Sequence, residues 1–273
     1  NAAKMGLKSV IFVPERAPSG KLSQLVMYGS NVIKIKGDYK DTFEASKQVI
    51  DEHHFYNRNA AINPHLVEGK KTVALEIAEQ MDFKDIDNVF VSVGDGCTVG
   101  GVYKGFYDLL QLKLINKIPK IIGVQSEGCS PFYTAWKNNT EITETDENTI
   151  ADSIAVGIPR NPVKGMNAII KSNGFFITVT DEEILDAMKI MGSNEGVFAE
   201  PAASASMAGL IKALKEKLIK NEDITVVIST GNGLKDQKSI IKQVEQVPIM
   251  LKEDVLKNIK NIFNKTNEVK DNE

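Results

Sequence analysis

The sequence has few of the residues that build disulfide scaffolds and zinc sites. Its 273 residues include only two cysteines, Cys97 and Cys129, and three histidines, of which His53 and His54 are adjacent. Two cysteines without a pairing pattern exclude a disulfide-stabilised small domain and fit a reduced, intracellular protein. Because the histidines and cysteines also lack the spacing of a zinc site, we expect no metal centre.

Excess charge of one sign and long apolar runs are missing as well. The 33 basic residues are balanced by 36 acidic ones, which gives a net charge of −3. Nucleic-acid binding requires a basic patch or stripe, so we expect no nucleic-acid partner. No apolar run approaches the roughly 18 residues of a membrane span, and no secretory leader opens the sequence. We therefore predict a cytoplasmic protein that does not associate with membranes.

The first residues have the pattern of the end of a helix. The chain opens with Asn1 rather than methionine, and Gly6 stands where a glycine commonly stops a helix. We therefore expect the chain to begin within a longer protein.

Apolar runs that are typical of buried strands alternate with helix-like segments along most of the chain. The expected strands are at 10–13, 32–35, 89–93, 121–124 and 224–228. The expected helices are at 18–28, 39–53, 68–81 and 202–220, with others that follow the glycine segment at 94–101 and the capping box at 180–183. This alternation predicts an α/β fold of mostly parallel sheets flanked by helices, and the length favours two domains.

The most informative segment is the glycine-rich run from Gly94 to Gly101, between a predicted strand and a predicted helix. Backbone N–H groups of such a loop, together with a helix N-terminus, make a cradle for an anion. The spacing fits neither a dinucleotide fingerprint nor a nucleotide P-loop, and the charge of Asp95 disfavours a polyphosphate. The segment therefore predicts a site for a single phosphate monoester, and the alternative is a plain turn from strand to helix.

Other residues are weaker candidates. Ser229 and Thr230 offer hydroxyl groups after the last predicted strand, at the sheet edge where α/β proteins bind ligands, although this segment could be a simple turn. Cys97 stands at a helix start, which lowers the pKa of a thiol, but no histidine is near it in sequence, so we do not expect a nucleophile. We interpret the small residues that follow Glu200 as packing.

Five segments together carry a resemblance to a known family. In chain order they are FVPERAPSGKLSQLVMYGS, NPHLVEGKKTVALEIAEQ, SVGDGCTVGGVYKGF, GVFAEPAASASMAGL and STGNGLKD. They resemble threonine synthase and its fold-type II pyridoxal-phosphate relatives, which include threonine dehydratase. The resemblance covers the chain up to about Pro248, and STGNGLKD is its most specific piece.

The resemblance implies a pyridoxal 5′-phosphate cofactor and assigns residues to it. The residues that correspond to the family's phosphate loop are Gly94, Asp95, Gly96, Cys97 and Thr98. Thr230 matches the hydroxyl that faces the pyridine nitrogen. A neutral partner there keeps this nitrogen largely unprotonated, which favours elimination and replacement chemistry.

We assign no lysine of this chain to the position of the family's Schiff-base lysine. The resemblance implies that this lysine, in a segment of the Ser-x-Lys type, precedes Asn1, together with an asparagine loop that contacts the cofactor. We therefore expect no catalytic residue among these 273 residues and no turnover by this chain alone.

The resemblance is weakest where the substrate would bind. Threonine synthases hold the substrate phosphate with an asparagine and an arginine around the Asn-Pro motif, where this chain has Ala60 and Leu66. Arg58, Asn59 and His65 are the nearby candidates to replace them. This difference leaves another amino-acid substrate open.

The domain division that follows is a remnant of a smaller α/β domain at 1–55, a larger cofactor-binding domain at 56–250, and a C-terminal helix with a polar tail at 251–273. The implied function of the intact protein is threonine synthesis from O-phosphohomoserine and water, with release of phosphate. One alternative is β-elimination by a threonine or serine dehydratase, which Leu66 favours; another is a non-catalytic small-molecule-binding paralogue. By analogy with the family, we expect a homodimer that takes a small amino-acid substrate.

Overall fold

A computed structural model describes residues 1–238, 241, 247, 249–255 and 259 of the chain. The chain divides into two compact units, Asn1–Gln237 and Lys238–Glu273. In the second unit, the described residues include a helical turn at 252–255. The predicted C-terminal helix and polar tail lie largely outside the described residues.

A small parallel sheet forms from the first part of the chain. Its elements are β1 (Val10–Pro14), α1 (Ser19–Met27), β2 (Asn31–Ile35) and α2 (Tyr39–His53). The two strands pair in parallel from Val10 opposite Asn31 to Pro14 opposite Ile35. Before them a short 3₁₀ turn, η1 (Ala3–Met5), ends at Gly6 in the left-handed conformation, as the sequence predicts.

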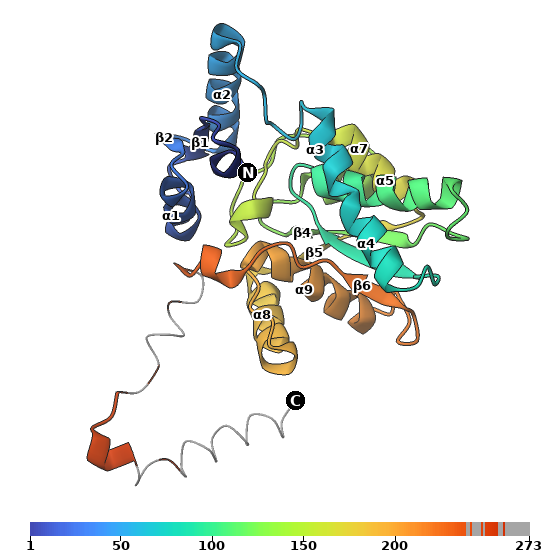
Figure 1. Ribbon diagram of the computed structural model, residues 1–273. Helices are drawn as coiled ribbons and strands as arrows, with labels where there is room; N and C mark the ends of the chain where they lie inside the picture. The colour runs from blue at the N-terminus through green and yellow to red at the C-terminus, as the bar shows by residue number, and fades with distance from the viewer. Residues whose placement is uncertain (239–240, 242–246, 248, 256–258, 260–273) are drawn as a thin grey trace. The chain divides into compact units, whose positions relative to one another are not determined.

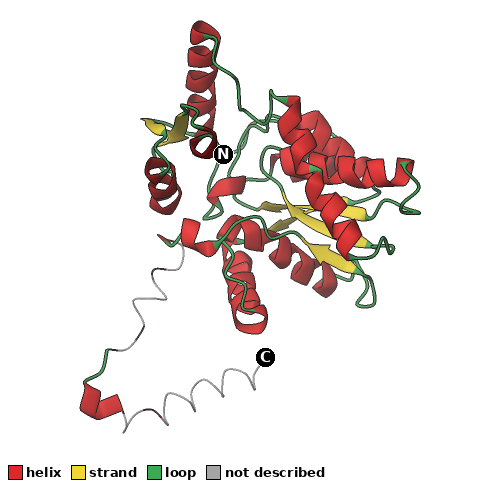
Figure 2. Ribbon diagram, viewed as in Figure 1, coloured by secondary structure: helices red, strands yellow, loops and turns green. Residues whose placement is uncertain are grey.

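The larger sheet has the order β5-β4-β3-β6, and all its paired strands are parallel (Figure 2). The strands are β3 (Asn88–Ser92), β4 (Lys120–Ser126), β5 (Phe175–Val179) and β6 (Thr225–Val227). The predicted α/β class with mostly parallel sheets is therefore confirmed.

Helices cover both faces of this sheet (Figure 1). Helices α3, α4, α5 and α7 lie on one side, and α8 and α9 lie on the other. The bounds are α3 (Pro64–Lys70), α4 (Thr72–Gln80), α5 (Cys97–Gln111), α6 (Pro131–Asn138), α7 (Pro162–Lys171), α8 (Asp181–Glu195) and α9 (Pro201–Lys215). Two 3₁₀ turns, η2 (Asp152–Ile154) and η3 (Gly233–Lys235), lie in loops.

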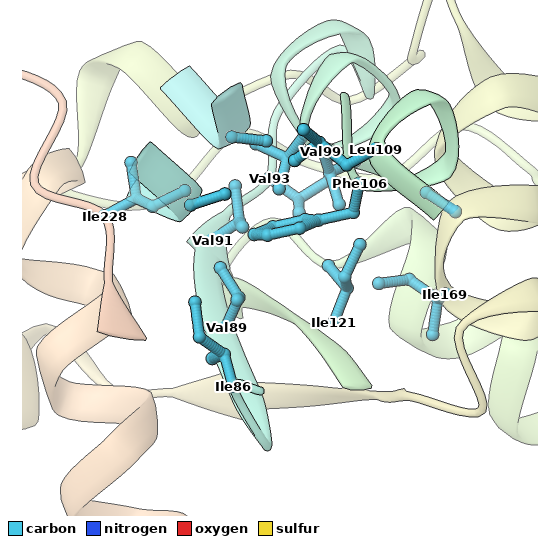
Figure 3. Packing of buried hydrophobic residues seen from close by; sticks show 14 of the residues in the cluster. Ile86, Val89, Val91, Val93, Val99, Phe106, Leu109, Ile121, Ile169 and Ile228 are labelled. Atoms are coloured by element: carbon cyan, nitrogen blue, oxygen red, sulfur yellow. The ribbon is translucent and has the colours of Figure 1, made fainter. Parts of the chain in front are cut away.

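Strand β3 is fully buried and supplies side chains to a core on each face. Val89 and Val91 pack with Phe106 of α5 in one hydrophobic cluster (Figure 3). Phe90 points to the opposite face and joins the cluster of α8 and α9. Burial on both faces explains why the strand is a continuous apolar run rather than an alternating one.

The structure differs from the expected elements at several places. The predicted helix at 68–81 is two helices, because Asn63 caps an earlier start at Pro64 and the chain turns at Lys71. The sequence interpretation missed α6, α7 and β5 altogether. Both missed helices have proline in the first turn, which favours a helix start, but their patterns are short and lack a capping side chain.

Candidate functional site

The two predicted ligand segments meet at one edge of the larger sheet. Strands β3 and β6 are hydrogen-bonded neighbours, so the glycine loop after β3 and Thr230 after β6 lie at the same carboxyl edge. From β3 the sheet continues through β4 and β5 on one side, whereas β6 lies on the other side of β3. The strand order therefore reverses at β3, and parallel sheets of this kind bind ligands at such a switch point. A cavity of about 530 Å³ lies there, and its lining includes Thr230 and the whole run from Gly94 to Thr98.

The glycine loop is held in a shape that only glycine permits at its centre. Gly96 has a φ of 84°, in the left-handed region. A Cβ atom at Gly96 would lie 2.7 Å from the carbonyl oxygen of Asn161 and 2.9 Å from Cζ of Phe132. The loop backbone is thereby pressed against the chain at 161, and its position is fixed by packing.

Helix α5 begins in this loop without a capping side chain. Gly96 is the N-cap residue, and as a glycine it has no side chain that could accept a hydrogen bond from the first turn. The first N–H groups of a helix have no partner within the helix, and they carry partial positive charge. The uncapped start of α5 is therefore chemically suited to an anion such as a phosphate group.

The carboxylate of Asp95 holds the loop to two other segments. Its Oδ2 accepts a hydrogen bond from the Tyr39 hydroxyl at 2.8 Å, and its Oδ1 accepts one from the backbone N–H of Arg160 at 2.9 Å. Burial, followed by the charge of Asp95, raises the pKa of Tyr39 well above its ordinary value, so the phenol remains a donor. Both oxygens of Asp95 are thus occupied, and the residue serves to fix the loop in place.

The thiol of Cys97 is buried and has a hydrogen-bond partner. Its Sγ accepts a hydrogen bond from Nδ2 of Asn161 at 2.9 Å. Burial, and then the negative charge of Asp95, raises the pKa of Cys97. A raised pKa disfavours the thiolate that a nucleophile needs, which supports the expectation that Cys97 is not one.

In the described part of the chain, three buried side-chain oxygens have no hydrogen-bond partner: Ser92 Oγ, Glu200 Oε2 and Ser204 Oγ. Ser92 and Glu200 are each 6% exposed, and both line the cavity. Buried polar atoms are nearly always hydrogen-bonded in folded proteins. Two such atoms on one cavity wall indicate that the cavity receives a ligand or water.

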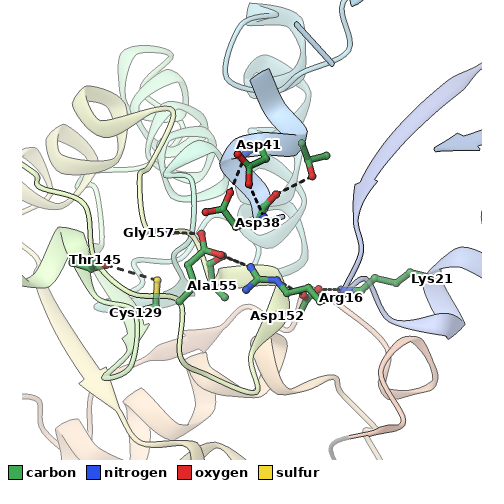
Figure 4. Close-up of polar contacts among 11 residues, drawn as sticks. Arg16, Lys21, Asp38, Asp41, Cys129, Thr145, Asp152, Ala155 and Gly157 are labelled. Atoms are coloured by element: carbon green, nitrogen blue, oxygen red, sulfur yellow. Dashed lines mark hydrogen bonds and ion pairs between the residues drawn. The ribbon is translucent and has the colours of Figure 1, made fainter. Parts of the chain in front are cut away.

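Glu200 also belongs to a charged cluster that joins helix α1 to the wall of the cavity. Figure 4 shows the part of this cluster around Arg16, Lys21 and Asp152. Lys21 Nζ donates to Ser153 Oγ at 2.7 Å and to Asp152 Oδ2 at 3.2 Å, and it lies 3.8 Å from Glu200 Oε2. Arg16 forms ion pairs with Asp152 and Glu147. The small sheet is thus tied by charge to the loop that closes one side of the cavity.

Lys21 and Lys70 both line the cavity. Lys21 stands in the sequence Ser19-Gly20-Lys21, which has the Ser-x-Lys spacing that our sequence interpretation placed before Asn1. Lys70, at the end of α3, donates from Nζ to Thr98 Oγ1 at 3.3 Å. Sequence reasoning missed both lysines as site residues, since only the spatial arrangement brings them to the glycine loop.

The substrate candidates of the sequence analysis lie elsewhere. Arg58 and His65 are exposed, and the side-chain amide of Asn59 donates to Ser46 Oγ at 3.4 Å. None of the three is among the residues that line the cavity, whereas Ala60 is. Their role in binding substrate stays a prediction.

Within the described residues, no group of three or more His, Cys, Asp or Glu side chains could hold a metal ion. A separate search of the same residues finds no helix with the length and apolar character needed to cross a membrane.

Comparison with known proteins places these features in a family. The model of the family described as "Pyridoxal-phosphate dependent enzyme" matches residues 1–231. The threonine synthase of Methanocaldococcus jannaschii is 38% identical over 263 residues, which is 94% of this chain and 64% of that protein. The threonine synthase of Methanosarcina acetivorans is 36% identical, over 91% of this chain and 62% of that protein. The chain therefore spans somewhat less than two thirds of the length of these relatives.

Solved structures show the same fold at lower sequence identity. Maize serine racemase aligns with a TM-score of 0.70 at 23% identity, over 89% of this chain and 72% of that one. The processed form of threonine deaminase isoform 2 from Solanum lycopersicum aligns with a TM-score of 0.73 at 21% identity, over 90% and 68%. These likenesses extend to the arrangement of the elements and not to the reaction.

Proposed function

Since this chain belongs to the pyridoxal-phosphate-dependent enzymes, we propose that it carries the cofactor-binding part of a threonine synthase-type lyase. The reaction would convert O-phosphohomoserine and water to L-threonine and phosphate. The observation that carries this proposal is the sequence identity of 33 to 38% to several curated threonine synthases, along most of this chain. We propose with it the division at about residues 55 and 250, a homodimer and a cytoplasmic location.

The cavity fits the cofactor that the family uses. The uncapped start of α5 would hold the phosphate, because the first N–H groups of the helix have no partner within the helix and carry partial positive charge. Thr230, at the end of the neighbouring strand β6, would face the ring nitrogen. Bound pyridoxal phosphate supplies an aldehyde that condenses with amines and a ring that withdraws electrons from the bonds at Cα.

The residues of this chain would act mainly by holding the cofactor rigidly. Asp95 ties the glycine loop to Tyr39 and to the backbone of Arg160, so the loop is in place before the phosphate arrives. Such preorganisation reduces the ordering that binding would otherwise require. The ion pairs of Lys21 and Arg16 bring the small sheet against the same cavity.

A dehydratase is the second candidate within the family. Leu66 is apolar at the position where the resemblance puts a phosphate-binding arginine, and threonine or serine would not need that charge. A paralogue that binds a small molecule without catalysis is the third candidate.

Assays of the protein expressed from its complete reading frame distinguish these functions. With O-phosphohomoserine, the proposal predicts equal amounts of phosphate and threonine. Formation of a 2-oxo acid and ammonia from threonine, without release of phosphate from O-phosphohomoserine, would favour the dehydratase. Cofactor binding without either reaction would favour the non-catalytic paralogue.

We also propose that the lysine that bonds to the cofactor lies outside these 273 residues. The 273-residue chain is incubated with pyridoxal phosphate, treated with borohydride and mapped by mass spectrometry. We expect no stoichiometric adduct on Lys21 or Lys70. A full adduct on Lys21, whose Ser-x-Lys context and place in the cavity make it the obvious rival, would contradict this part of the proposal.

A further inference from the structure

We propose that Lys70 is a cationic ligand for a phosphate monoester bound at the start of helix α5. The inference rests on the proposed function, because its cofactor and its substrate both carry such a group. It adds a charged side chain to a cradle that otherwise consists of glycines and backbone N–H groups.

The position of Lys70 is the first support. It is the last residue of α3, it is half-buried, and it lines the cavity. Its Nζ donates a hydrogen bond to Oγ1 of Thr98, the second residue of α5, at 3.3 Å. The ammonium group therefore lies beside the first turn of α5, where the N–H groups have no partner within the helix.

Close contact between α3 and α5 fixes this position. A Cβ atom at Gly101 would come within 2.6 Å of Cβ of Lys70, so the stem of the lysine lies directly against α5. Only a residue without a side chain at 101 permits this approach. The charge is thus held at the helix start by packing of the two helices.

The neighbouring lysine shows that the arrangement of Lys70 is not that of an ordinary surface ion pair. Lys71 Nζ lies 2.8 Å from a carboxylate oxygen of Glu68 and 3.0 Å from one of Asp108. In the part of the chain that the structure describes, no ion pair joins Lys70 to a carboxylate. Its one hydrogen-bond partner there is the neutral hydroxyl of Thr98.

The other charged residues of the cavity already have partners. Lys21 and Arg16 form ion pairs with Asp152, and both oxygens of Asp95 accept hydrogen bonds. Lys70 is the positive charge of the cavity that is left without an anionic partner among the described residues. A half-buried cation attracts an anion more strongly than a fully exposed one, because water and salt screen it less.

A separate observation indicates that the cavity receives a ligand or water. Oγ of Ser92 and Oε2 of Glu200 are buried in its wall and form no hydrogen bond. Neither atom is part of the glycine loop or of α3. Since Glu200 Oε2 also lies 3.8 Å from Lys21 Nζ, the hydroxyl of Ser92 is the stronger evidence for an occupant of the cavity, and it is independent of the argument about Lys70.

The test compares Lys70→Gln with the matched control Lys71→Gln in the protein from the complete reading frame. Affinities are measured for pyridoxal phosphate and for pyridoxal, which lacks the phosphate. If Lys70 binds the cofactor phosphate, Lys70→Gln weakens binding of pyridoxal phosphate about tenfold and leaves pyridoxal unchanged, since a hydrogen bond to a charged group contributes about that much. Lys71→Gln should change neither affinity, and Lys70→Arg should restore most of the loss.

A second arm identifies the source of the phosphate. If Lys70 binds the substrate instead, Lys70→Gln leaves both cofactor affinities unchanged and weakens inorganic phosphate and O-phosphohomoserine about tenfold in the cofactor-loaded protein. The ³¹P resonance of bound pyridoxal phosphate should shift in Lys70→Gln only in the first case.

Two results would overturn the inference. One is equal affinity of Lys70→Gln and the unmodified protein for every phosphate compound. The other is an equal loss for pyridoxal and pyridoxal phosphate, which would mark Lys70 as a merely structural residue. Failure of the unmodified protein to bind pyridoxal phosphate would overturn the proposed function as well, so the two failures are distinguishable.

Discussion

Helices α5 and α8 begin in opposite ways. At α8, the side chain of Thr180 accepts from the N–H of Glu183, and the Glu183 side chain accepts from the N–H of Thr180. At α5, the N-cap is Gly96, which has no side chain to satisfy the N–H groups of the first turn. The start of α8 is closed by its own residues, whereas the start of α5 is open and lines the cavity.

The difference shows how a binding site can be made by leaving out a common stabilising feature. A capping box satisfies orphan N–H groups and stabilises a helix by about 1 kcal/mol. Helix α5 forgoes this local stabilisation, and its loop is instead fixed by contacts with distant residues, including Tyr39, Arg160 and Asn161. The helix start is therefore rigid but chemically unsatisfied, as an anion site requires.

The largest expected effect comes from adding a side chain at Gly96, the N-cap of the open start. In Gly96→Ala, the alanine would have to adopt the left-handed φ of this position. Its methyl carbon would also lie 2.7 Å from the backbone oxygen of Asn161. We expect a loss of about 2 to 5 kcal/mol in the free energy of unfolding, from backbone strain and overpacking together. Urea denaturation measures it.

Gly196→Ala is the matched control. Gly196 ends α8 with a φ of 66°, and a Cβ atom there would meet nothing within 4 Å. It should lose only the strain contribution of about 1 to 2 kcal/mol. Equal losses for the two variants would contradict the claim that packing fixes the glycine loop.

A smaller effect is expected from opening the closed start. Thr180→Ala removes one half of the capping box and should lower the free energy of unfolding by about 1 kcal/mol. Affinity for pyridoxal phosphate should not change, since α8 begins at a different strand, β5. A weakened affinity in this variant would show that the two helix starts are not independent. Urea denaturation and equilibrium dialysis on the same preparation measure both quantities.

The elements with strong local signals could be predicted from the sequence. The capping patterns at Asp38 and Thr180 and the apolar run of β3 gave the correct helices and strand. Helices α6 and α7 were missed because they are short and begin without a capping side chain. Their place is set by packing on the sheet, through residues such as Phe132 and Ile169. Such tertiary stabilisation leaves little trace in a local pattern.

The residues of the candidate site also fall into those with a local sequence signal and those without one. The glycine loop and Thr230 carry a local signal, because both directly follow predicted parallel strands and parallel strands end at one edge. The residues that support the loop have no such signal, since Tyr39 is 56 positions and Arg160 is 65 positions from Asp95. Lys70 could be noticed only once α3 was seen against α5. Sequence reasoning thus predicted the glycine loop and Thr230 as site candidates and missed the residues that surround them in the fold.

The most specific effect, no larger than that of Thr180→Ala, concerns a third helix start. Tyr39 at the start of α2 supports the glycine loop at the open start of α5. Tyr39, the first residue of α2, donates to Asp95, and burial and then the charge of Asp95 raise its pKa. The unfolded chain ionises this phenol near pH 10 while the folded chain keeps it protonated. Its contribution to stability is therefore complete below about pH 10 and declines as the pH rises further. Tyr39→Phe should cost about 1 kcal/mol at pH 8.

Because phenylalanine does not titrate, the gap between Tyr39→Phe and the unmodified protein should narrow as the pH rises above 10. Urea denaturation at several alkaline pH values measures this gap, with Tyr28→Phe, which removes an exposed hydroxyl, as the control. A gap that stays constant or widens above pH 10 would mean that Asp95 does not hold Tyr39 in its neutral form. The position of the open start of α5 would then rest on its other contacts, such as those with Arg160 and Asn161, more than on the hydrogen bond from the capped start of α2.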